Sequence, residues 1–157
     1  MNVFAPHFHP TLSARALHDK HVVKMTLETA QLASTVAHEF GIEFPGQYRP
    51  THANHPCTRA MIESPLYRAW VMLHGAALAA EYTRRYGKRH KSQDVIEAAT
   101  EALGPYPSIW HQRIPFPLCM PEEFHRPVET FEPGASICPH ASYRAYLAAK
   151  YGAWEAT

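Results

Sequence analysis

The sequence predicts an all-α protein, a single compact domain of about four helices with a long proline-rich irregular segment before the last helix. Long stretches carry apolar residues at helical spacing, and none shows the alternation of apolar and polar residues that is typical of strands. A length of 157 residues suits one domain with a proper core and is short for two. Residues 1–157 are therefore expected to form one all-α domain.

The first helix is expected over about residues 11–39. Pro10 followed by Thr11 is typical of a helix entry and N-cap, and Gly41 is a stop signal. Asp19 could mark a break or bend inside this stretch. Apolar side chains cover much of the helix circumference, which favours a central position packed on more than one side; they include Leu17, Val22, Leu32 and Val36.

A second long helix is expected after a loop over about residues 41–56. Ser64 and Pro65 form a helix start, because serine is a good N-cap and proline fits the first turn. The apolar periodicity continues from there to Gly87, so this helix should be about as long as the first.

The C-terminal part of the chain should be less regular. Ser92 is expected to cap a helix over about 93–103, which ends at Gly104. Eight of the fourteen prolines lie between Pro105 and Pro139, so that segment should be an extended wrap and neither a helix nor a central strand. Pro139 opens a last helix over about 139–150. Its tyrosines share one side and should be mostly core, whereas Trp154 could pack or stack on a ligand; the tyrosines are Tyr143, Tyr146 and Tyr151.

Composition excludes several classes of protein. No apolar run approaches the roughly 20 residues that cross a bilayer, and the first ten residues lack the basic and apolar regions of a signal peptide. Cys57, Cys119 and Cys138 are odd in number and widely separated, which argues against a disulfide framework and favours small buried residues in a reducing cytoplasm. The net charge of +1 does not demand a nucleic acid, and the oligomeric state stays open.

Residues 18–28 place two histidines and a glutamate on an otherwise apolar face of the predicted helix. At about 100° per residue, His18, His21 and Glu28 fall in one arc of roughly 80° together with Met25 and Leu32. A carboxylate buried there needs a partner, so we expect Glu28 to be buried and hydrogen-bonded to a histidine, either His21 or a histidine of the 41–56 loop. The alternative is that His18 and Glu28 lie at the edge of the stripe and satisfy each other or a neighbouring backbone.

The loop supplies a second histidine group, His52 and His55, with Asn54 between them. His18, His21, His52 and His55 could hold a metal ion in a tetrahedral site with an open position, although neither pair has the i, i+4 spacing of the familiar zinc helix. The alternative is that His55-Pro56 caps a short helix and His52 is solvated. Asn54 could hydrogen-bond a base or sugar edge. No other cofactor is predicted.

A basic run follows the second long helix. Six of the eight residues from 84 to 91 can be cationic, a dense cluster in a nearly neutral protein that could bind the phosphates of a nucleic acid. A solvated helix end with salt bridges to Glu81 or Asp94 is the alternative. The candidate phosphate ligands are Arg84, Arg85, Lys88, Arg89 and Lys91.

Three motifs carry a resemblance to a family of small phage-type proteins: His-Asp-Lys-His-Val-Val-Lys-Met-Thr-Leu-Glu, Thr-His-Ala-Asn-His-Pro-Cys, and Met-Pro-Glu-Glu-Phe followed by Tyr-Arg-Ala-Tyr. More remotely, the chain is similar to phage-type pyrimidine-dimer DNA glycosylases. A histidine precedes the catalytic glutamate of that family by seven positions, as His21 precedes Glu28 here. The basic Arg-Arg-Tyr-Gly after a long helix, and the late Lys-Tyr-Gly with a following aromatic residue, also look alike.

The resemblance implies a cytoplasmic DNA-repair enzyme of the glycosylase/AP-lyase type, or a relative acting on a modified base or nucleotide. Met1 would supply the nucleophilic α-amine, and Glu28 would act as the acid–base group with His21 beside it. The family begins with threonine after loss of methionine, whereas the bulkier Asn2 here disfavours that removal. His18, His52, Asn54 and His55 would contact substrate, and the basic run would hold the DNA backbone. Leu27 and Gln31 stand where the family has arginines.

Two other classes of function stay open on the sequence. One is a histidine-based metal-dependent enzyme on a small substrate, built from the four histidines named above. The other is a non-catalytic nucleic-acid-binding protein of the same fold.

Overall fold

A computed structural model describes residues 1–128 and 136–156. Within these residues the regular structure is helical: α1 (Pro10–Arg15), α2 (Asp19–Glu39), α3 (Pro56–Glu63), α4 (Pro65–Tyr86), α5 (Gln93–Leu103) and α6 (Pro139–Glu155), with a 3₁₀ turn over Glu122–Phe124. One isolated bridge pairs Pro127 with Ile137, and the described residues form no strand. The predicted all-α class is confirmed. None of the helices in this part of the chain is long and apolar enough to span a membrane.

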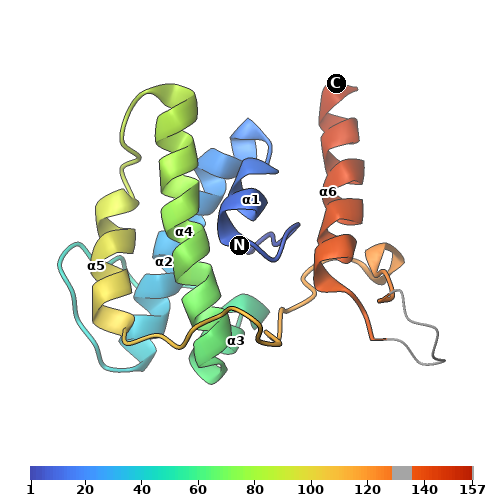
Figure 1. The fold of residues 1–157 in the computed structure, drawn as a ribbon. Helices are drawn as coiled ribbons and strands as arrows, with labels where there is room; N and C mark the ends of the chain where they lie inside the picture. The colour runs from blue at the N-terminus through green and yellow to red at the C-terminus, as the bar shows by residue number, and fades with distance from the viewer. Residues whose placement is uncertain (129–135, 157) are drawn as a thin grey trace.

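Helix α4 is the centre of the helical body (Figure 1). It contacts α1, α2, α3 and α5, and α2 in turn contacts α3 and α5. Gly75 lets α4 approach α2 closely, because a Cβ at this position would lie 2.6 Å from Cγ2 of Thr29. The main packing is therefore of α4 on α2, with the shorter helices arranged around this pair.

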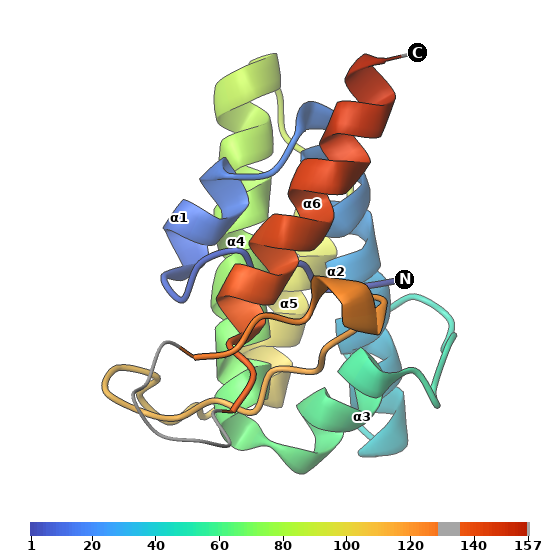
Figure 2. The ribbon, with the colours of Figure 1, turned by 90° about the vertical axis from the view of Figure 1, so that its right-hand side faces the viewer.

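The first residues of the chain run between this helical body and α6, as Figures 1 and 2 show. Val3, Phe4 and Ala5 are buried. The ring of Phe4 lies 4.5 Å from that of His21 on α2 and 6.2 Å from that of Tyr143 on α6. Helix α6 is attached to the body largely through these N-terminal residues.

The proline-rich segment crosses the molecule as an irregular chain, as predicted. The hydroxyl of Tyr143 donates to the carbonyl of Pro117 at 2.6 Å, and Phe116 packs edge-on against Trp70 with ring centroids 4.9 Å apart. Both contacts hold the segment between α4 and α6. The prediction of an irregular wrap for residues 129–135 lies outside the described residues.

The helical stretch expected over residues 11–39 is two helices in the structure, and the second begins at Asp19, where the sequence allowed a break or bend. His9, and not Thr11, is the N-cap of α1, and the chain turns at residues 16–18 before His18 caps α2. The Nδ1 atoms of four histidines accept backbone N–H groups two residues ahead, at 3.0–3.2 Å; the histidines are His9, His18, His55 and His90. Sequence rules for capping favour Ser, Thr, Asp and Asn, so they missed the caps at His9 and His18. The cap of α3 by His55 was an expected alternative, and His90 precedes α5 without capping it.

The other expected boundaries fare differently. Ser64 caps α4 through a 3.1 Å bond from the N–H of Tyr67, and Gly87 ends this helix with φ of 65°, as predicted. Helix α5 has the predicted bounds, but Ser92 makes no side-chain cap bond because its hydroxyl pairs with that of Tyr48. The structure adds the short helix α3 after the 41–55 loop and extends α6 past Gly152.

Helix α4 also buries a histidine, His74, inside the core. This side chain is 1% exposed and stacks on Trp70, with ring centroids 4.7 Å apart. Neither of its ring nitrogens has a hydrogen-bond partner among the described residues. Burial lowers the pKa of His74 from 6.5 to about 3, so the ring is neutral in the folded protein at neutral pH.

Replacing His74 by phenylalanine should make the protein less sensitive to acid. The unfolded chain protonates His74 near pH 6.5 and the folded one only near pH 3, so this residue lowers stability as the pH falls through that window. Between pH 7 and pH 5 the loss due to His74 is about 2 kcal/mol.

The measurement is urea unfolding of wild type and His74→Phe at both pH values. The loss of unfolding free energy should be smaller in the variant by about that amount, whereas His38→Gln, a change at an exposed histidine, should behave as wild type. Parallel pH dependences of wild type and His74→Phe would contradict this account.

Candidate active site

Glu28 is buried beneath the N-terminus of the chain. The residue lies in the middle of α2 and is 6% exposed. Its Oε2 accepts the backbone N–H of Asn2 at 2.9 Å, and its Oε1 lies 3.7 Å from the N-terminal amine of Met1 and 3.6 Å from Nζ of Lys24. Two nitrogens of the backbone and one lysine therefore satisfy a carboxylate that would be costly to bury alone.

A cavity of about 210 Å³ opens beside this carboxylate. The N-terminal segment, α2 and α6 line it together, and two lysines, Lys24 and Lys150, face it from the two helices. The lining residues are Met1, Asn2, Phe4, His21, Lys24, Met25, Glu28, Tyr146 and Lys150. A reactive amine, a carboxylate and two cations thus share one small pocket.

His21 belongs to this pocket but does not contact Glu28 as expected. Its Nδ1 is hydrogen-bonded to the hydroxyl of Tyr151 at 2.8 Å, and its ring packs against Phe4 and Trp154. Seven residues along a helix span about 10 Å, so the two side chains are separated by two turns, and Met1 and Asn2 reach the carboxylate instead. The expected burial of Glu28 is confirmed, but its expected histidine partner is wrong for the described residues.

The electrostatics of the pocket keep His21 neutral. Burial lowers the pKa of His21 from 6.5 to about 4, and the charges of Lys150, Lys24 and His18 add to this effect. A neutral imidazole held by a tyrosine hydroxyl positions aromatic neighbours without adding a charge next to the lysines.

The four polar residues expected to contact substrate do not line this cavity. His18 caps α2 and packs against Tyr151 and Trp154. His52 is exposed, with its Nδ1 bonded to the hydroxyl of Thr51, and Asn54 is exposed. His55 caps α3 and is not among the lining residues, although burial and then the charge of the nearby N-terminal amine lower its pKa.

The four histidines proposed as metal ligands do not gather. His18 and His21 lie at the start of α2 against α6, whereas His52 is on the exposed loop. Within residues 1–128 and 136–156, the group that has at least three possible ligands close together is His55 with Cys57 and Cys119. The geometry therefore does not support a four-histidine metal enzyme.

Most of the basic run is occupied by ion pairs. Arg84 and Arg85 both bind the buried carboxylate of Glu81, whose pKa they lower to about 2, through hydrogen bonds from Arg84 above all. Arg85 also donates to the carbonyl of Leu17 and to Asp19, which ties the end of α4 to the start of α2. These ion pairs engage Arg84 and Arg85, two of the five residues expected to bind phosphate.

Arg89 pairs with two acidic residues of α5, Asp94 and Glu97. Lys88 and Lys91 remain exposed and without an ion pair among the described residues. The expected alternative, a helix end held by salt bridges, thus describes the three arginines.

Sequence reasoning missed the cations that face the cavity. Lys24 precedes Glu28 by four residues, and this i, i+4 spacing is a recognisable signal for an ion pair on one helix face. Lys150 lies on α6 and has no such signal, because it reaches the site only when α6 packs over the N-terminal segment.

The fold and pocket define a class: a small helical protein in which the chain's N-terminal residues cover a buried carboxylate beside a cationic pocket. A family model described as pyrimidine dimer DNA glycosylase matches residues 1–94. The chain belongs to the pyrimidine dimer DNA glycosylase family. Comparisons with curated proteins and with solved structures found no significant match.

The matched region includes the N-terminus, Glu28, His21, the loop histidines and the basic run. Family membership supports a DNA glycosylase-type function in DNA repair, with DNA as the substrate. The proline-rich segment and α6 lie beyond the matched region, so Tyr146 and Lys150 reach the pocket from outside it.

The two unpaired lysines of the basic run should contribute more to DNA binding than its paired arginines. Lys88→Gln/Lys91→Gln should weaken duplex binding and reduce the slope of log affinity against log salt by up to about 1.8, since each phosphate contact adds about 0.9. The matched control, Arg84→Gln/Arg89→Gln, should change the slope less, because acidic partners already offset both arginines. Equal slopes for both double variants, measured by fluorescence anisotropy, would contradict this ranking.

Proposed function

We propose that this protein is a DNA glycosylase with AP-lyase activity that uses its N-terminal amine as nucleophile and Glu28 as the acid–base group. The observation that carries the proposal is the contact between the N-terminal backbone and a buried carboxylate in a cationic pocket, with the Met1 amine 3.7 Å from Oε1 of Glu28. A primary amine and a carboxylate in reach of each other are the two groups that this chemistry needs.

The proposed reaction is balanced without a cofactor. The neutral amine forms a bond to C1′ of the deoxyribose while the bond from C1′ to the base breaks, and the base leaves with that electron pair and takes up a proton. Glu28 accepts the proton released by the amine and stabilises the positive charge that develops on the sugar. The C1′–O4′ bond then breaks, O4′ takes up the proton held by Glu28, and the nitrogen lone pair forms the C1′=N bond of a Schiff base. Water hydrolyses this Schiff base, or loss of a proton from C2′ expels the 3′-phosphate by β-elimination and cleaves the strand.

Two backbone nitrogens lie at the carboxylate, and this matters for the identity of the nucleophile. The amine of Met1 is the nucleophile if methionine is retained, as the bulk of Asn2 favours. If methionine is removed, the nitrogen of Asn2 becomes the terminal amine, already 2.9 Å from Oε2 of Glu28. The mass of the purified protein decides between the two residues, and Glu28 serves either amine.

Lys24 and Lys150 are proposed to hold the DNA backbone at the pocket. The family's arginines beside and after the glutamate are replaced here by Leu27, which is 39% exposed, and by the half-buried Gln31. Lys24 has a side chain that is 65% exposed, so its ammonium group can reach a phosphate while remaining near Glu28. An extruded nucleotide would thus meet cations from α2 and α6.

Blocking the terminal amine should abolish covalent chemistry. Acetylation of the N-terminus removes the nucleophilic lone pair, so borohydride should no longer trap a protein–DNA adduct on abasic or dimer-containing duplex. Protein taken through the same procedure without the acetylating reagent is the matched control and should still be trapped. Undiminished trapping after complete acetylation would contradict the proposed nucleophile.

Glu28→Gln should bind DNA within about twofold of wild type and lose about 10²- to 10⁴-fold in turnover. The amide oxygen of glutamine can still accept the N–H of Asn2, so the fold should persist, but the side chain can no longer take a proton. Glu39→Gln, an exposed change at the end of the same helix, is the control and should keep full turnover. Single-turnover kinetics separate binding from chemistry.

The same experiments distinguish the non-catalytic alternative. A protein that binds damaged and undamaged duplex equally, forms no adduct and is insensitive to Glu28→Gln would be a binder that kept the fold without the chemistry.

A further inference from the structure

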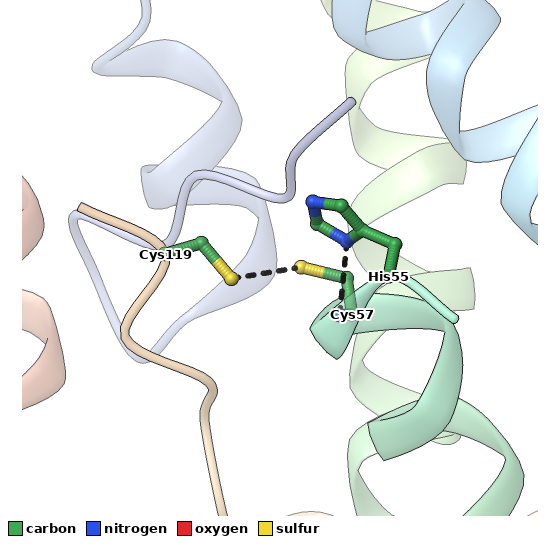
Figure 3. Close-up of side chains that lie close together, drawn as sticks. All are labelled: His55, Cys57 and Cys119. Atoms are coloured by element: carbon green, nitrogen blue, oxygen red, sulfur yellow. Dashed lines mark hydrogen bonds between the residues drawn. The ribbon is translucent and has the colours of Figure 1, made fainter. Parts of the chain in front are cut away.

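Two cysteines and a histidine from distant parts of the sequence meet beside the N-terminal residues. His55 and Cys57 lie at the first turn of α3, and Cys119 lies on the proline-rich segment (Figure 3). One ligand atom from each of the three side chains lies within 4.8 Å of the other two. Cys57 is fully buried, and the other two residues are half-buried.

The spacing of the two sulfur atoms suits a shared metal ion. Sγ of Cys57 and Sγ of Cys119 are 3.6 Å apart. Two thiolates that bind one tetrahedral Zn²⁺ at about 2.3 Å lie about 3.8 Å from each other, so the sulfur pair needs little movement. The imidazole must move closer to the sulfur atoms, because its bond to the ion is about 2.0 Å long, and its Nδ1 must exchange the N–H of Cys57 for the ion.

We propose that His55, Cys57 and Cys119 form a binding site for a thiophilic divalent cation of the Zn²⁺ class, with the fourth coordination position open. Two thiolates and an imidazole are the ligand set that zinc prefers over magnesium or calcium. This site is separate from the cavity at Glu28, and the proposal does not depend on the nucleophile.

The electrostatic environment supports a thiolate at this position. The hydrogen bond from Cys57 lowers the pKa of the Cys119 thiol, and the hydroxyl of Tyr143 and the charge of the N-terminal amine lower it further. The hydrogen bond to Cys119 and burial raise the pKa of the Cys57 thiol. A bound cation would displace the protons of both thiols.

A bound ion would join Cys119 to α3 and so fix the residues that contact Asn2. The side-chain amide of Asn2 donates to the carbonyl of Cys119 at 2.9 Å, and Sγ of Cys57 lies 3.9 Å from Oδ1 of Asn2. Because Asn2 also donates its backbone N–H to Glu28, a metal that joins Cys119 to α3 holds Asn2, and with it the terminal amine, at the carboxylate. The three ligands are positioning residues in this account.

Zinc content of the whole protein tests the inference without any activity assay. The protein is kept reduced with a phosphine, loaded with zinc sulfate, dialysed and measured by elemental analysis. Wild type should retain about one zinc per chain, and zinc should raise its melting temperature. Cys138→Ser, a change at the cysteine outside the group, is the matched control and should retain the same amount.

Two variants remove ligands with little threat to folding. Cys119→Ala changes a half-buried residue, and His55→Asn keeps an N-cap acceptor for α3. Each should bind zinc at least about tenfold more weakly in competition with a chelating dye, since even outer partners of a ligand contribute that much. Neither should show the thermal shift with zinc.

Retention of no zinc by the reduced wild type, or equal zinc in wild type and both variants, would overturn the proposal. A different result would also overturn it: the reduced protein takes up no zinc, and the protein loses two free thiols in air. That result would assign Cys57 and Cys119 to a disulfide formed by molecular oxygen.

Discussion

The buried carboxylate of Glu28 is the constraint on which the rest of the structure depends. A carboxylate in the middle of an apolar helix face needs donors, and the chain supplies them from its own first two residues. Residues 1–5 run between α2 and α6, and side chains of α6 pair with backbone carbonyls at the end of this segment. His140 bonds to the carbonyl of Ala5, and Arg144 donates to that of Pro6. The need of Glu28 for hydrogen-bond donors is thus met by the N-terminal residues, on which α6 packs.

Histidine serves this protein chiefly as a neutral structural residue. An Nδ1 that accepts a backbone N–H must carry its proton on Nε2, so the capping histidines are fixed in one tautomer. His21 and His74 are kept neutral by burial. Burial therefore keeps both His21 and His74 from adding positive charge near neutral pH.

The charges of the protein are divided between two tasks. The arginines at the end of α4 are bound to Glu81, Asp94 and neighbouring acids, so they join helices. Lys24 and Lys150 stay available at the pocket. The family-matched residues 1–94 provide the amine and the carboxylate, whereas α6 beyond them provides the second lysine and Tyr146. The pocket is complete only when both parts of the chain pack together.

The sequence by itself determined the helical class, the α4 and α5 boundaries, the irregular proline-rich segment and the burial of Glu28, because periodicity, capping and proline geometry act over a few residues. It could not supply the backbone partners of Glu28, which is 26 residues from Asn2, nor the approach of Cys57 to Cys119 across 62 residues. Only the tertiary structure decided these contacts, since they form when α6 and the proline-rich segment close over the N-terminus and no local pattern records which distant groups a buried charge or thiol will meet.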